Sequence, residues 1–77
     1  MSSPDKLVYM ANQIGKFFAS QGKDAEVQNI ATHMKKFWEP RMLRQIFAHL
    51  DAGGAGLAPP VKAALESLRA QETVAAR

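Results

Sequence analysis

The chain has 77 residues, which is enough for one domain that buries only roughly 60–65% of the surface exposed when unfolded. It has no cysteine, which excludes disulfides, thiolate metal sites and iron–sulfur ligation, and its net charge of +3 is weak evidence for nucleic-acid binding. No segment approaches the ~18 apolar residues of a membrane span. The start MSSPDKLVYM lacks a signal-peptide pattern, so we expect a soluble, intracellular protein.

The first predicted helix begins near Ser3, because serine is a good N-cap, Pro4 suits the first helical position and Asp5 suits the first turn. Gly22 lies where the C-terminus of this helix is expected. At about 100° per residue, the apolar residues of the segment share one helical face. They are Leu7, Met10, Ala11, Ile14, Phe17 and Phe18.

The second predicted helix has Asp24 as its cap, and its apolar residues repeat the spacing of the first: Val27, Ile30, Ala31, Met34, Phe37 and Trp38. The sequences MANQIGKFF (10–18) and IATHMKKFW (30–38) are also similar. Either two amphipathic helices share this pattern by chance or one helix was duplicated. Both alternatives predict an antiparallel helix pair joined by a short loop that contains glycine.

Pro40 ends the second helix and suits the start of a third, whose apolar face is Met42, Leu43, Ile46, Phe47 and Leu50. The run AGGAG (52–56) stops that helix, and two prolines then open a fourth with a narrower stripe, Val61, Ala64, Leu65 and Leu68. No segment alternates with period two, so no strand is expected. The sequence predicts an all-α single domain over residues 1–77, a small bundle of three to four short helices. We expect an ordered core at about 4–68 and a frayed, flexible tail at 69–77.

Candidate catalytic and metal-binding groups are sparse. His33 and His49 lie on different predicted helices, and neither has a second ligand at a metal-binding spacing. The seven acids are scattered, and the glycines of the AGGAG run are not followed by the Lys-Ser/Thr of a phosphate-binding loop. These observations favour a non-catalytic chain with no metal or cofactor of its own.

The stretch KKFWEPRMLR (35–44) combines two aromatic residues, a methionine and four cations. One interpretation places Phe37 and Trp38 in the core with the cations facing water. The other is an exposed interaction site, since Trp and Arg are enriched at the energetic centres of protein interfaces. With four Phe, one Trp and four Met in so short a chain, some apolar surface is expected to stay exposed, which usually marks a binding face.

Three stretches resemble the delta subunit of bacterial NAD-dependent formate dehydrogenase: KLVYMANQIGKFFASQG (6–22), HMKKFWEPRMLRQIFAHL (33–50) and DAGGAGLAPPVKAAL (51–65). The resemblance covers about residues 4–68. It implies a cytoplasmic, non-catalytic accessory subunit that assists assembly, stability or cofactor insertion. The expected partner is the alpha (catalytic) subunit, which carries a molybdenum or tungsten bis-pterin cofactor and iron–sulfur clusters. Beta and gamma subunits would carry FMN and further clusters to NAD.

The resemblance transfers no catalytic, cofactor-binding or metal-binding residue to this chain. As the partner interface we predict Asn12, Gln13, Phe17, Phe18, Phe37, Trp38, Arg41, Met42 and Arg44. A small basic helical protein that binds nucleic acid is the alternative, based on Lys35, Lys36, Arg41 and Arg44. A third hypothesis is a homodimer that buries its own apolar surface.

Overall fold

The computed structural model describes the backbone of residues 4–75 and the side chains of residues 5–71. This part of the chain forms four helices and no strand, which confirms the all-α prediction. They are α1 (Pro4–Phe18), α2 (Lys23–Phe37), α3 (Pro40–Asp51) and α4 (Pro59–Ala75).

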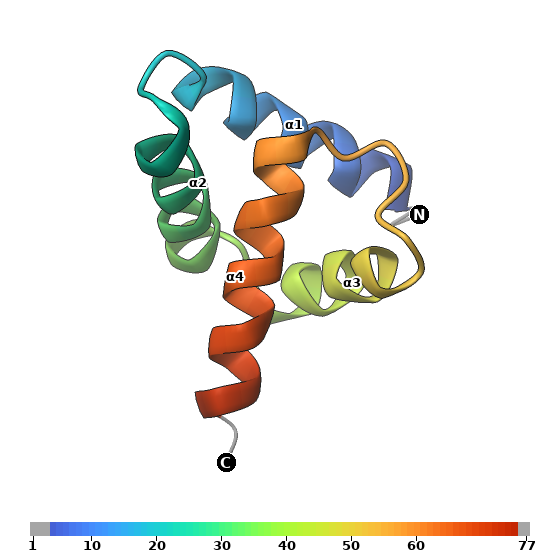
Figure 1. Cartoon of the computed structure of the whole chain (residues 1–77). Coiled ribbons are helices and arrows are strands. Elements are labelled where there is room, and N and C mark those ends of the chain that lie inside the picture. The colour runs from blue at the N-terminus through green and yellow to red at the C-terminus, as the bar shows by residue number, and fades with distance from the viewer. Residues whose placement is uncertain (1–3, 76–77) are drawn as a thin grey trace.

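The helices form a compact arrangement in which α4 packs against all three others (Figure 1). Helices α2 and α4 lie side by side, both begin near α1, and they make the most extensive contact in the protein. Helix α1 crosses near the start of both, and α3 lies on the other side of α4. The expected close pairing of the first two helices is therefore less extensive than the packing of α2 on α4.

The boundaries of the helices differ in detail from the prediction. Helix α2 begins at Lys23, and Gly22, with φ 90°, is its N-cap, so the prediction that Asp24 caps the helix was wrong. Asp24 lies instead in the first turn, where a negative charge interacts favourably with the helix dipole. The predicted cap Ser3 lies outside the described residues.

The C-terminal helix extends further than its apolar stripe. Helix α4 runs to Ala75, whereas the stripe ends at Leu68. The flexibility expected for residues 69–77 stays a prediction, and residues 76–77 lie outside the described part.

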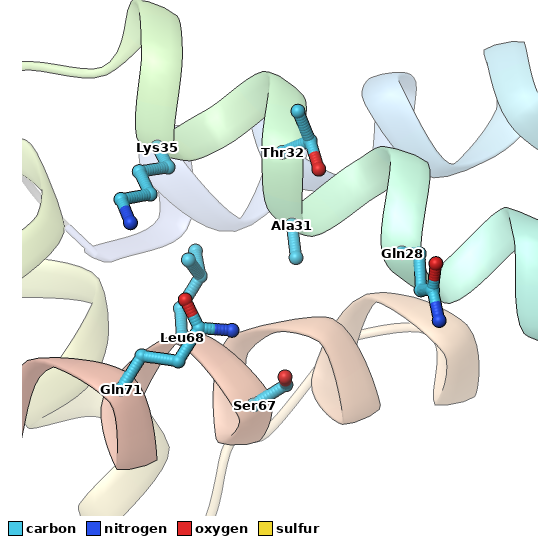
Figure 2. A pocket seen from close by; sticks show the side chains of 7 residues that line it. All are labelled: Gln28, Ala31, Thr32, Lys35, Ser67, Leu68 and Gln71. Atoms are coloured by element: carbon cyan, nitrogen blue, oxygen red, sulfur yellow. The ribbon is translucent and has the colours of Figure 1, made fainter. Parts of the chain in front are cut away.

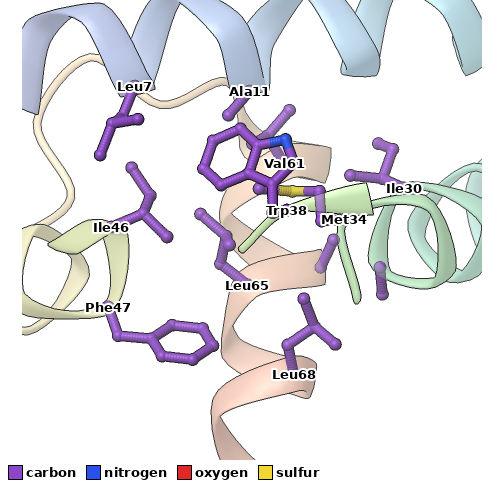
Figure 3. Packing of buried hydrophobic residues seen from close by; sticks show 12 residues of the cluster. Leu7, Ala11, Ile30, Met34, Trp38, Ile46, Phe47, Val61, Leu65 and Leu68 are labelled. Carbon is purple, nitrogen blue, oxygen red and sulfur yellow. The ribbon is translucent and has the colours of Figure 1, made fainter. Parts of the chain in front are cut away.

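The core is a single cluster to which all four helices contribute (Figure 3). Every residue of the predicted α4 stripe is buried, together with the centres of the other three apolar faces. The buried members are Leu7, Ala11, Ile30, Ala31, Met34, Trp38, Ile46, Phe47, Val61, Ala64, Leu65 and Leu68. Burial of apolar area is the main driving force for folding, so this cluster fixes how the helices are placed.

A glycine allows the closest approach between α1 and α4. A Cβ atom on Gly15 would lie 2.5 Å from Cγ2 of Val61, which is fully buried on α4. Only a residue without a side chain fits at this crossing. The position of α1 over the start of α4 therefore depends on Gly15.

None of the helices in the described residues combines the length and the apolar character that a membrane crossing requires.

Candidate docking surface

Four rings from two helices form a continuous chain of contacts, which we call the aromatic patch: Phe17, Phe18, His33 and Phe37. Phe17 meets Phe18 edge-on, with ring centroids 5.0 Å apart. Phe18 lies 6.1 Å from His33, and His33 lies 4.7 Å from Phe37. These separations are in the range of favourable aromatic contacts, so the patch has a defined geometry.

Much of the aromatic patch faces solvent. Phe17 is 77% exposed and Phe37 is 64% exposed, although both are large apolar side chains. A hollow of about 270 Å³ lies beside Phe17, and its lining residues are Gln13, Ile14, Phe17, Phe18 and His33. Exposed apolar area next to a hollow is typical of a surface that another protein covers.

Helix periodicity explains how the patch forms. His33 and Phe37 are four residues apart on α2, so they lie one above the other on one face. Phe17 and Phe18 end α1 where it crosses α2, and Phe18 reaches His33. The patch therefore depends on the packing of α1 against α2.

The structure separates two adjacent aromatic residues that the sequence placed on one stripe. Phe37 is the last helical residue of α2, whereas Trp38 has an extended backbone, with φ −85° and ψ 135°. This change of backbone direction turns the indole into the core, where Trp38 is only 7% exposed (Figure 3). Trp38 is therefore a core residue, as the first interpretation of this stretch has it, and little of its side chain is left on the surface. Its predicted contact with a partner stays a prediction.

Asn12, another predicted interface residue, is occupied by contacts within the chain. Its side-chain NH₂ donates to the carbonyl of Gly56 at 3.0 Å, and its side-chain oxygen accepts from the N–H of Ala58 at 3.0 Å. On the other side of the same loop, Nε2 of His49 lies 2.7 Å from the carbonyl of Ala55. Asn12 thus fixes the loop between α3 and α4 to α1.

The remaining predicted residues divide between two places. Gln13, Phe17, Phe18 and Phe37 come together at the aromatic patch. The others lie on α3: Arg41 and Arg44 are exposed, and Met42 packs partly buried against the core.

Two members of this surface, Ile14 and His33, are absent from the predicted interface. Lys36 was predicted only within the stretch 35–44 and as part of the nucleic-acid alternative. The ammonium of Lys36 lies 5.8 Å from the centre of the Phe37 ring, within range of a cation–π interaction. The spacing of His33 and Phe37, four residues apart, was a signal that pointed to their contact.

A second, more polar groove of about 440 Å³ lies between α2 and α4 (Figure 2). Its floor includes Ala31 and Leu68, and its walls carry hydrogen-bonding side chains: Gln28, Thr32, Lys35, Ser67 and Gln71. Lys35 lies here, whereas the adjacent Lys36 lies over Phe37. These two cations of the nucleic-acid hypothesis therefore face different sides of α2.

Among the residues that the structure describes, no three His, Asp or Glu side chains are grouped so that they could hold a metal ion.

Comparison with protein families gives a match over residues 6–65 to the model FdsD, the NADH-dependent formate dehydrogenase delta subunit. The chain belongs to this family. Comparison with curated proteins and with solved structures found no match.

The matched segment contains the whole aromatic patch of this formate dehydrogenase delta subunit, together with Asn12 and the loop that it holds. By contrast, Ser67, Leu68 and Gln71 on the α4 side of the groove lie beyond the match. The aromatic patch therefore lies fully within the matched segment, whereas the groove between α2 and α4 lies only partly within it.

Proposed function

We propose that this delta subunit is a non-catalytic accessory chain that docks through the aromatic patch onto the large catalytic subunit of formate dehydrogenase. In this proposal it acts in the cytoplasm and assists the assembly, stability or cofactor loading of the complex. The molybdenum or tungsten cofactor, the iron–sulfur clusters, FMN and the NAD site belong to the other subunits.

The observation that carries the proposal is the exposure of Phe17 and Phe37 beside an apolar hollow. Aromatic side chains in a well-packed interface are often the residues that contribute most to affinity. Membership of a family of formate dehydrogenase subunits supplies the setting, because a subunit has other chains of the complex as partners.

The test is co-purification of the complex from cells in which a tagged copy of this chain replaces the original. The double variant Phe17→Ser/Phe37→Ser is expected to lose most of the co-purifying catalytic subunit. Its far-UV circular dichroism spectrum should match the original, since both side chains are mostly exposed. The matched control Gln28→Ala/Thr32→Ala changes the groove side of α2 and should keep the complex.

Undiminished co-purification of the double phenylalanine variant would exclude the aromatic patch as the docking surface. A catalytic subunit that assembles with full cofactor content and normal stability in cells lacking this chain would argue against the accessory role itself.

A further inference from the structure

We propose that the partner surface covering the aromatic patch consists of one apolar side chain, inserted into the hollow, and an adjacent carboxylate that meets Lys36. This inference rests on the docking proposal above and specifies the chemistry of the partner.

The hollow defines the apolar part of the partner. Ile14, Phe17 and Phe18 form its apolar walls, and Gln13 and His33 add polar groups to its lining. Its volume of about 270 Å³ corresponds to roughly nine waters at ~30 Å³ each, which is the size of one large side chain rather than of a helix. The amide of Gln13 and the ring of His33 offer hydrogen-bonding groups to the backbone beside that side chain.

The charges around the hollow define the polar part of the partner surface. The ammonium of Lys36 lies 5.8 Å from the Phe37 ring centre, and that ring lies 4.7 Å from His33, which lines the hollow. No residue of the aromatic patch or of the hollow's lining is acidic. A carboxylate is therefore the complementary group.

The same charges favour a different chain over a second copy of this one. If two copies met through the aromatic patch, neither patch would offer an acidic side chain to the other copy's Lys36, and this charge would lack a complementary group. A phosphate-rich partner would satisfy Lys36 but would leave the apolar hollow unfilled. An acidic protein surface with one protruding apolar side chain satisfies both features.

Two adjacent lysines provide a matched test. Lys36→Glu reverses the charge at the aromatic patch, and Lys35→Glu makes the same change one residue away, in the groove with α4. Both residues lie in the last turn of α2, so the interaction of the new charge with the helix dipole is the same. The dissociation constant of each variant is measured against formate dehydrogenase purified from cells that lack this chain.

We expect Lys36→Glu to weaken binding about three- to tenfold, while Lys35→Glu stays within about twofold of the original. Raising the salt concentration should weaken the original more than Lys36→Met, which keeps most of the alkyl chain and loses the charge. If Lys36→Glu and Lys35→Glu changed the dissociation constant equally while Phe17→Ser still weakened binding, the proposed partner carboxylate would be wrong and the docking proposal would stand. Normal binding by Phe17→Ser/Phe37→Ser would overturn both.

Discussion

Phe37 and Trp38 are adjacent in the chain but have opposite surroundings. The indole of Trp38 packs between α1 and α4, whereas the Phe37 ring is 64% exposed beside His33 and Lys36. A phenylalanine in that position is held by contacts on one side only. The free energy of unfolding should therefore depend strongly on Trp38 and weakly on Phe37.

We predict that Trp38→Ala lowers the free energy of unfolding by about 3–5 kcal/mol, because it leaves a cavity in the core. A domain of this size is stable by only about 4–12 kcal/mol, so this variant should lose a large part of its stability. Phe37→Ala should cost less than about 1 kcal/mol. Urea denaturation followed by circular dichroism measures both. A larger loss for Phe37→Ala than for Trp38→Ala would contradict the orientation of these two rings.

For individual residues, the sequence predicted which side chains are buried better than which are exposed. The α4 stripe and the buried centres of the other helices followed from the 3.6-residue period alone. The separation of Trp38 from Phe37 did not, because it depends on an extended backbone after the last turn of α2, and the period does not describe such a residue. Asn12 was also unpredictable, since its partners are separated from it by 44 and 46 positions in sequence.

Among the helices, the crossing of α1 over α4 leaves no room for an added side-chain atom at Gly15. Gly15 lies directly against Val61, a β-branched residue with few alternative rotamers. The four helices themselves could be predicted from caps, prolines and apolar stripes. Their arrangement could not, because matching stripes show which faces are buried and not which helices meet. We expected α1 and α2 to pair, but in the structure α2 packs more extensively against α4.

We predict that Gly15→Ala is destabilising by about 1–2 kcal/mol, even though alanine is intrinsically the better helix former by about 1 kcal/mol. The added methyl group must displace Val61. Val61→Ala should relieve this clash, so the double variant should lose less than the sum of the two single variants. Thermal unfolding of the original protein, the two single variants and the double variant measures this difference. A Gly15→Ala variant more stable than the original would show that α1 and α4 separate easily.

The whole molecule combines one shared core with a partly uncovered aromatic patch. Its Cα radius of gyration is 11.5 Å, and all four helices contribute buried residues to a single cluster. A chain of this length has little stability to spare. Covering the exposed rings of Phe17 and Phe37 would add buried apolar area that the isolated subunit lacks.

We therefore predict that the delta subunit is more stable in the complex than alone. With the partner in free excess at 100 times the dissociation constant, the gain is about 2.7 kcal/mol. Hydrogen exchange measured on the free and the bound chain should show slower exchange in α1 and α2 on binding. The same experiment with Phe17→Ser/Phe37→Ser should show no slowing. Protection confined to α4 would place the interface on the groove instead.

The hydrogen bonds of Asn12 have a consequence for how the chain folds. They join the first helix to the segment that leads into the last one, so a single side chain links α1 to the start of α4. The amide of Ala58 finds this acceptor only after α1 is in place. A truncated protein without its first helix would consequently lose the ordered entry into α4 as well, so α1 cannot be removed without loosening the start of the last helix.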